Sequence, residues 1–543
     1  MRLRSIVVLG ALTIGFALPA RAADPAEPTV VLRFKSIDGM IADAKYVLGL
    51  AGQGELGKQL EALIDSQAGP KGLVGTGLDT KKPFGVYVNV GAAGVDSTGA
   101  ILIPVADEKA FVAFLGEQLE TKGVKLSRGS DGVYTLTSDA APVSAFLGFS
   151  EGYAYVTVID KDPIAGGKRL SPAKIFPAND TALIGLTARL DRIPDLLKQL
   201  GFGLLENRLA DHKEAQPGES EAVTKKRGTA IDQFAECLKG WIDQAGTLSI
   251  AASVDRKSEE LAFDASLTGK PGTDLAASIQ GLSTATTRSL GNGLAGEFGV
   301  NIAIPDKMRE ATAIYVETLF KDAMSKEKDV VKKALLRKAF DAVLPTIKAG
   351  QVNIMAGLNG PKPDGKYSLL LGMQLAEEKK VEGLVKEMYP SVPPEIREKI
   401  KLDAETIAGT PVHIVNAPND LTPDIRRVFG DSATVQIAFP KEMVVIGLGN
   451  DASAVLKSVL TDTGRRPAPP MSVEGSIVKL APLDRDNAGA AVKVAKEVFG
   501  SAASGSDAIR VSIQGGSSLH FRASVKGLAL KYAGMLKDEV GGK

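Results

Sequence analysis

The chain has 543 residues, with 65 lysines and arginines against 64 aspartates and glutamates. Such balanced charge gives no bulk electrostatic basis for binding nucleic acid or an anionic membrane. Hydrophobic residues make up 44% of the chain, which is ordinary for a globular protein, and the length suits two large domains or three to four smaller ones.

The first 22 residues predict a secretory signal peptide. Arg2 and Arg4 precede an apolar run from Ser5 to Leu18, and small residues follow at Ala20 and Ala22. The run is short for a membrane span, and no later stretch reaches the roughly 18 apolar residues that a spanning helix needs. We therefore expect a secreted or periplasmic protein with no stable membrane span after cleavage; an uncleaved anchor is the alternative.

Strands followed by helices recur along the chain. Val30 to Ser36 alternates as a strand and leads into a helix with Asp38 as its expected N-cap. Phe298 to Ile304 alternates in the same way and is also followed by a helical pattern. The stretch from residue 308 to 347 predicts two long helices with a break near Ser325 to Asp329, and their apolar positions are those of core contacts or of a partner-binding face.

A second pair of similar segments switches from period two to period 3.6 at the same step. The strand Ala100 to Val105 runs into a helix from Ala106, and Tyr367 to Leu375 runs into a helix from Ala376. Apolar residues in both helices recur at i, i+3 and i+4, as in a helix that packs on a sheet.

The last pair consists of LAFDASL (Leu261 to Leu267) and LHFRASV (Leu519 to Val525), which are identical at four of seven positions. Both alternate and predict strands with one apolar face. Because the matching segments keep the same order along the chain, we interpret them as copies of a duplicated unit. The alternative is that short strand and helix patterns resemble one another by chemistry alone.

The predicted fold is α+β, with two tandem, duplicated modules at 29–285 and 296–540. We expect each module to be a mainly antiparallel or mixed sheet covered by helices, with a helical hairpin at about 194–245 inserted in the first. The predicted inward positions of three strands are Leu261, Phe263, Ala265, Leu267, Leu519, Phe521, Ala523, Val525, Leu369, Leu371, Met373 and Leu375.

Motifs that resemble active sites lack the context that the chemistry needs. Ser150 lies in a G-x-S-x-G match, but a strand and not a helix follows it. Gly291 to Gly296 matches G-x-G-x-x-G but precedes a strand, and the calcium-like run from Asp484 lacks a Glu at its last position. We interpret Asp484 as a helix cap and the single cysteine, Cys237, as a buried small hydrophobic residue.

The three histidines, His212, His413 and His520, lie in different predicted elements without a second ligand at metal-binding spacing. The sequence therefore predicts no catalytic, cofactor-binding or metal-binding residues and no cofactor. A pair of carboxylates acting as general acid and base leaves no sequence signature, so an enzyme stays an open alternative.

Several segments resemble an uncharacterised family of exported bacterial proteins of unknown function. These segments are VVLRF (Val30 to Phe34), PVADEKAF (Pro104 to Phe111), GYAYVTV (Gly152 to Val158) and ALIGLTARLDRIPDLLKQLG (Ala182 to Gly201). The resemblance covers most of the first module, is looser in the second, and implies no activity or site residues.

Three functional hypotheses follow. The first is an exported, non-catalytic binding or scaffolding protein of the cell envelope, whose partner is an envelope macromolecule. The second is a carrier of apolar small molecules such as lipids, with the predicted inward faces lining its groove. The third is an exported hydrolase with an atypical carboxylate site. We expect no nucleic-acid partner in any of them.

Overall fold

The computed structural model describes residues 27–68, 73–92, 94, 96–138, 141–215, 220–282, 286–288, 293–304, 306–416, 422–431, 433–461, 465–502 and 504–541. The predicted signal peptide and most of the G-x-G-x-x-G run lie outside these residues. The chain forms two compact units. Unit 1 comprises residues up to 201, 245–268 and 526–538, and unit 2 comprises 202–244, 269–525 and the last few residues.

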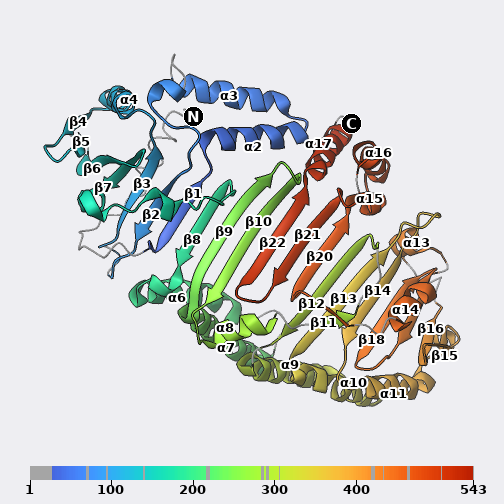
Figure 1. The fold of residues 1–543 in the computed structure, drawn as a ribbon. Helices are drawn as coiled ribbons and strands as arrows, with labels where there is room; N and C mark the ends of the chain where they lie inside the picture. The colour runs from blue at the N-terminus through green and yellow to red at the C-terminus, as the bar shows by residue number, and fades with distance from the viewer. Residues whose placement is uncertain are drawn as a thin grey trace. The chain divides into compact units, whose positions relative to one another are not determined.

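Unit 1 contains ten antiparallel strands in the order β4-β5-β6-β7-β3-β2-β1-β8-β9-β10 (Figure 1). The central strand β1 pairs with β2 on one side and β8 on the other. The strands are β1 (Val30–Phe34), β2 (Phe84–Asn89), β3 (Thr98–Pro104), β4 (Val124–Arg128), β5 (Tyr134–Ser138), β6 (Ala141–Ser150), β7 (Tyr153–Val158), β8 (Ile184–Arg189), β9 (Ala245–Asp255) and β10 (Glu260–Gly269).

Both faces of the unit 1 sheet are partly covered by other segments of the unit. Helix α4 packs through Phe111 and Leu119 on β5, β6 and β7, and a segment that includes Ile164 and Ile175 covers Tyr87 and Tyr155 on the other face. The helices are α2 (Ile37–Leu50), α3 (Gly54–Ala68), α4 (Glu108–Glu120), α5 (Pro172–Ile175) and most of α17 (Gly527–Gly541). Helix α6 (Asp195–Ala210) crosses the boundary between the units.

Unit 2 also contains ten strands in one antiparallel run, in the order β15-β16-β17-β18-β14-β13-β12-β20-β21-β22 (Figure 1). These strands are β12 (Gly296–Ala303), β13 (Gln351–Asn359), β14 (Ser368–Gln374), β15 (Ile400–Ile407), β16 (Thr410–Val415), β17 (Thr434–Ala438), β18 (Met443–Gly449), β20 (Met471–Ser476), β21 (Ala508–Gln514) and β22 (Leu519–Lys526). A separate pair consists of β11 (Thr286–Arg288) and β19 (Arg465–Pro467).

The helices of unit 2 include the two predicted for residues 308 to 347. They are separated at residues 327–329, as expected, and Phe320 stacks on Phe340 with ring centroids 4.0 Å apart. The helices are α7 (Glu221–Gln244), α8 (Asp274–Gly281), α9 (Asp306–Lys326), α10 (Val330–Ala349), α11 (Glu378–Met388), α12 (Pro394–Arg397), α13 (Pro423–Phe429), α14 (Ala452–Thr461), α15 (Ile477–Leu480) and α16 (Ala488–Phe499). None of the described helices combines the length and apolar character that a bilayer span requires.

The two units pair their strands in the same order. Replacing β1–β7 by β12–β18, and β8–β10 by β20–β22, converts the first order into the second. This arrangement agrees with the α+β prediction; the duplication itself stays a prediction. Helices α6 and α7 occupy the region of the expected helical hairpin, but residues 202–244 group with unit 2, where α7 packs on α9.

The strands expected from alternation are confirmed, whereas the predicted cap of the first helix is wrong. LAFDASL lies within β10 and LHFRASV within β22. The first helix is capped by Ser36 and not by Asp38, because the Ser36 hydroxyl accepts a hydrogen bond from Gly39 N at 3.2 Å. Asp38 lies in the first turn of α2, where a negative charge is favourable to the helix dipole.

Candidate functional site

One face of the unit 2 sheet carries only apolar side chains and glycine on six adjacent strands. Residues that lie directly opposite in antiparallel strands share a face, so the register defines it. One row runs through Ala523, Val511, Val473, Phe298, Ala356 and Leu371. We call this surface the open face of unit 2: Phe521, Ala523, Val525, Ile509, Val511, Ile513, Met471, Val473, Phe298, Val300, Ile302, Ile354, Ala356, Leu358, Leu369, Leu371 and Met373.

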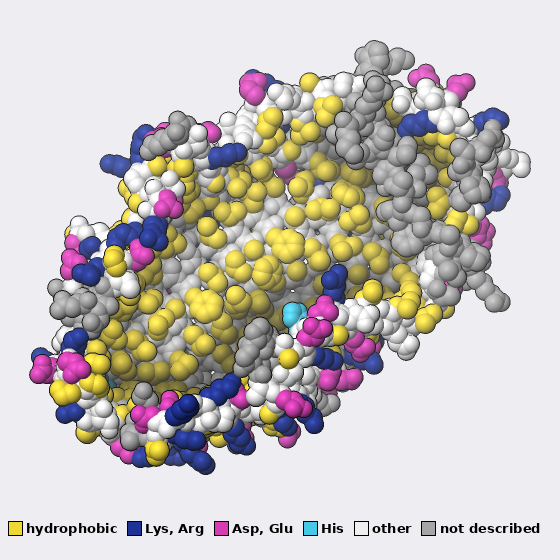
Figure 2. All heavy atoms as spheres, turned by 180° about the vertical axis from the view of Figure 1, so that it is seen from behind, with side chains coloured by type: hydrophobic (Ala, Val, Ile, Leu, Met, Phe, Trp, Pro, Cys, Tyr) yellow, Lys and Arg dark blue, Asp and Glu magenta, His cyan; other side chains and the backbone are white. Residues whose placement is uncertain are grey.

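The open face is exposed to an extent that is unusual for so apolar a surface. Met373 is 42% exposed, Leu371 38% and Ile509 44%, and none of the other residues that define the face is fully buried. Figure 2 shows hydrophobic side chains gathered on the sheet face seen from behind. Contiguous apolar surface of this kind marks a binding site more often than a structural surface.

The opposite face of the same strands is built differently. On β20, β21 and β22 it carries Ser472, Glu474, Arg510, Ser512 and Arg522, which suit contact with water. Over β14, β16, β17 and β18 it is covered by α14, with buried residues that include Leu370, Val412, Val445 and Leu456. Opposite the open face, the sheet therefore has a filled core under α14 and a polar surface over β20, β21 and β22.

Unit 1 has a smaller open face with the same construction. Ile101, Val86, Leu32, Leu186 and Ile250 form one cross-strand row on β3, β2, β1, β8 and β9, and all five are partly exposed. The next row contains Phe84 and Phe34, whose rings stack 4.9 Å apart, followed by Ile184, which is 39% exposed.

Helix α11 closes one end of the open face of unit 2. Its residues Val381 and Val385 pack against Leu375, Phe439 and Val444. The predicted inward position Leu375 is accordingly buried, at 2% exposed. Of the other predicted inward positions on β14 and β22, all except Leu519 are among the residues that define the open face.

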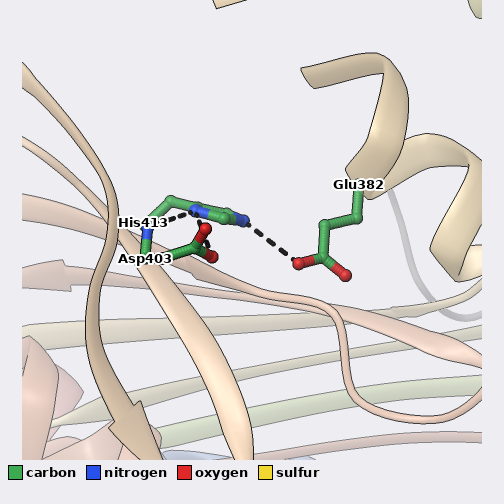
Figure 3. A group of neighbouring side chains, drawn as sticks. All are labelled: Glu382, Asp403 and His413. Atoms are coloured by element: carbon green, nitrogen blue, oxygen red, sulfur yellow. Dashed lines mark hydrogen bonds and ion pairs between the residues drawn. The ribbon is translucent and has the colours of Figure 1, made fainter. Parts of the chain in front are cut away.

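A polar cluster of Glu382, Asp403 and His413 lies beneath α11 (Figure 3). His413 extends the row of Leu371 through Ile446 and Ile437, and it is only 2% exposed. Its Nε2 lies 3.7 Å from Oε1 of Glu382, and its Nδ1 lies 3.8 Å from Oδ1 of Asp403. These three residues come from α11, β15 and β16.

A bulge in β15 positions Asp403 against the histidine. The register between β15 and β16 shifts between Lys401 and Glu405, and Asp403 has a φ of 49°. Aspartate tolerates this left-handed conformation better than most residues. As a result the backbone N–H of Asp403 donates a hydrogen bond to Nδ1 of His413 at 3.0 Å.

This hydrogen bond opposes metal binding by His413. Because Nδ1 accepts a hydrogen bond from the Asp403 backbone N–H, the neutral ring must carry its own proton on Nε2. Neither nitrogen then has a free lone pair for a cation. In a histidine that binds a metal, the nitrogen that does not bind the metal normally donates its N–H to a hydrogen-bond acceptor. Lys386 Nζ also lies 3.0 Å from Glu382 and 2.9 Å from Asp403, so an ammonium already supplies positive charge there.

The ionisation of the cluster follows from burial and these charges. Burial lowers the pKa of His413 below its usual value, and Lys386 lowers it further, against the raising effect of the Asp403 and Glu382 carboxylates. Burial by itself would raise the pKa of Glu382, but hydrogen bonds from Lys386 and Lys379 outweigh it and the pKa lies below the usual value. The cluster therefore consists of a neutral imidazole beside compensated carboxylates.

A pocket of about 440 Å³ in unit 2 contains a pair of carboxylates. Glu297 on β12 lies directly opposite Glu474 on β20, and both line this pocket. Desolvation, followed by the charge of Glu474, raises the pKa of Glu297. Glu474 is paired with Arg510 at 3.0 Å. Two carboxyl groups in different environments are the arrangement that acid–base chemistry uses.

The structure separates the other candidate residues of the sequence. Ser150 ends β6 and pairs with Tyr153 across a tight turn, which confirms a hairpin and not a nucleophile elbow. Cys237 lies in α7 and is half-buried, less than expected. Asp484 does not cap α16, whose N-cap is Asn487; it accepts hydrogen bonds from Asp486 N and Asn487 N in the preceding turn.

The histidines do not converge, since His212 lies in the short turn Asp211–Lys213 and His520 lies on β22. Sequence reasoning did not find Glu382 and Asp403 as neighbours of His413. The only local signal is the spacing of Glu382 and Lys386, which places them on one helix face.

Comparison of the chain with models of protein families found no match, and neither the curated proteins nor the solved structures that were searched include a match. The resemblance to a family of exported bacterial proteins therefore stays a prediction.

Proposed function

We propose that this protein is an exported, non-catalytic binding protein that holds apolar molecules on the open faces of its sheets. The observation that carries the proposal is the open face of unit 2, on which six adjacent strands present only apolar side chains and glycine, many of them exposed. Export is supported by the N-terminal sequence from Met1 to Ala22.

The chemistry of the open face favours an apolar small molecule over a protein partner. Protein interfaces carry roughly one hydrogen bond per 100–200 Å² and are enriched in Tyr, Trp and Arg. The residues of the open face include no hydrogen-bonding side chain, and its backbone groups pair within the sheet. Its ligand must therefore be recognised by apolar contact alone.

An acyl chain is the ligand class that meets this condition. Each buried methylene contributes about 0.8 kcal/mol, so a chain that lies along several cross-strand rows gains substantial affinity without polar contacts. The polar headgroup of such a lipid would have to lie beyond the open face, where charged side chains are available.

The experiment measures binding of the fluorescent apolar probe 1-N-phenylnaphthylamine, with native mass spectrometry of the protein from its own compartment to identify bound lipid. We compare the wild type with the double variant Leu371→Asp and Met373→Asp. The matched control is Ile396→Asp with Val492→Asp, because these side chains are 46% and 43% exposed but lie on α12 and α16.

The proposal predicts that the wild type and the control bind the probe, while the Leu371 and Met373 variant loses most of the binding and remains folded by circular dichroism. Wild-type protein that binds no probe and carries no lipid, or a control that loses binding to the same extent, would contradict it.

The carboxylate pair supports a second candidate function, that of an exported hydrolase. Glu297, with its raised pKa, would act as general acid beside Glu474 in the 440 Å³ pocket. A panel of p-nitrophenyl esters and glycosides tests this function. Turnover that disappears in Glu297→Gln supports it, and the absence of turnover by wild-type protein argues against it.

A further inference from the structure

Helix α10 carries a local excess of positive charge in a chain whose overall charge is balanced. Between Lys326 and Asp341 the sequence has six basic residues, and three acidic ones at positions 327, 329 and 341. Two of the basic residues are already paired: Lys326 with Asp322 at 2.7 Å, and Lys338 with Glu387. Lys328, Lys333 and Arg337 are exposed and form no ion pair with the part of the chain that the structure describes.

Exposed aliphatic side chains accompany these cations. Val330, at the start of α10, is 80% exposed, and Leu336 is 44% exposed. Val330, Lys333 and Arg337 follow the spacing i, i+3 and i+7, which places them along one side of the helix. We call Lys328, Val330, Lys333, Leu336 and Arg337 the basic edge.

The helix that carries the basic edge packs against its neighbours within unit 2. Helices α9 and α10 are fixed to each other by the stacked rings of Phe320 and Phe340 and by the pair of Lys348 with Glu317 at 3.1 Å. A hydrogen bond between Ser220 and Asp322 brings the start of α7 to the end of α9. The exposed Lys225 and Lys226 of α7 lie one turn from this junction and add to the positive charge.

We propose that the basic edge docks on the surface of an anionic lipid bilayer. Cations that face an anionic leaflet, together with aliphatic side chains that enter the headgroup region, are the two features of a helix that lies on a membrane. Val330 and Leu336 supply the apolar contact, and Lys328, Lys333 and Arg337 supply the charge. A nucleic acid or an acidic protein would use the cations but would leave an 80% exposed valine without a role.

Co-sedimentation with vesicles tests this inference. The intact protein is mixed with vesicles of phosphatidylcholine alone or of phosphatidylcholine with phosphatidylglycerol, at low and at physiological salt. The test variant is Lys333→Glu with Arg337→Glu. The matched control is Lys457→Glu with Lys496→Glu, which makes the same charge change at exposed positions of α14 and α16.

We expect the wild type and the control to sediment with the anionic vesicles and not with the neutral ones, less so as salt rises. The Lys333 and Arg337 variant should bind at least about tenfold more weakly, because each cation near an anionic surface contributes to binding. Equal binding to both vesicles, no binding to either, or full binding by that variant would overturn the proposal.

The inference does not rest on the proposed function, and the two can fail separately. The Lys333 and Arg337 substitutions leave the open face intact, so they should not change the affinity for the apolar probe. Conversely, wild-type protein that binds anionic vesicles but not the probe would support docking by the basic edge and contradict the proposed binding of apolar molecules.

Discussion

Nζ of Lys386 lies 3.0 Å from Oε1 of Glu382, one turn earlier on α11, and its second partner is Asp403 on β15. A single ammonium thus joins the helix that closes the open face to the edge of the sheet below it. Glu382 is 8% exposed at its side chain, so its charge depends on these partners.

Replacing Lys386 by Met should destabilise unit 2. The change leaves the buried Glu382 carboxylate with Lys379 as its remaining cationic partner and removes the tie to Asp403. We expect a loss of about 1–3 kcal/mol in the free energy of unfolding, measured by urea denaturation. Lys379→Met should cost less, because that lysine is 67% exposed. Equal losses in the free energy of unfolding for the two variants would show that the contact of Lys386 with Asp403 adds no stability.

His413 should make the protein less stable as the pH falls. Its pKa in the folded protein lies below the ordinary value of 6.5, so the folded state binds this proton less readily than the unfolded chain. The stabilisation is therefore complete above that ordinary value and is lost as the pH falls from it through the folded pKa, by about 1.4 kcal/mol for each unit between the two.

The variant His413→Asn isolates this effect. Its side-chain oxygen can still accept the hydrogen bond from Asp403 N, but it does not titrate. The free energy of unfolding, measured by urea denaturation between about pH 7.5 and pH 5, should change less with pH than that of the wild type. Parallel curves for the two proteins would refute the assignment to His413.

Zinc should not stabilise the protein through the cluster of Glu382, Asp403 and His413. Nδ1 of His413 is occupied by the Asp403 amide, and Lys386 holds both carboxylates. A metal that binds the folded state at 100 times its Kd would add about 2.7 kcal/mol. Thermal denaturation with and without excess zinc should give the same midpoint, and a rise that disappears in His413→Asn would contradict the argument.

Adjacent leucines on β14 should differ sharply in their contribution to stability. Leu370 is 1% exposed in the core beneath α14, whereas Leu371 is 38% exposed on the open face. Leu370→Ala should cost about 2–5 kcal/mol, as buried leucines do, and Leu371→Ala about 1 kcal/mol or less. Urea denaturation of the two variants compares the two sides of one strand. Similar losses would mean that the open face is packed in solution.

Alternation in the sequence predicted where this fold has strands, but it could not predict what covers them. The apolar positions of Leu519 to Val525 and of Leu369 to Met373 are on a common face, as expected from period two. The same pattern is produced by a filled core, by a ligand groove and by an exposed patch. The distinction depends on where α11 and α14 pack, and period two within a strand carries no information about that.

The polar cluster was beyond sequence reasoning for a different reason. His413 and Asp403 are brought together by a bulge, and a bulge moves a residue out of the register that alternation implies. The predicted helix caps show a related limit. Ser36, two residues before Asp38, is the N-cap of α2, and Asn487, three residues after Asp484, is the N-cap of α16. Local propensity locates a helix but not its first residue.

The uniform composition of the open face has a consequence for selectivity. The side chains from Phe521 on β22 to Met373 on β14 are all apolar. They would not discriminate between alkyl tails of different length, or between saturated and unsaturated tails. One methylene more or less changes affinity only modestly in an apolar site. A carrier of this construction would therefore accept a mixed population of tails, and any preference among its cargoes would come from their headgroups.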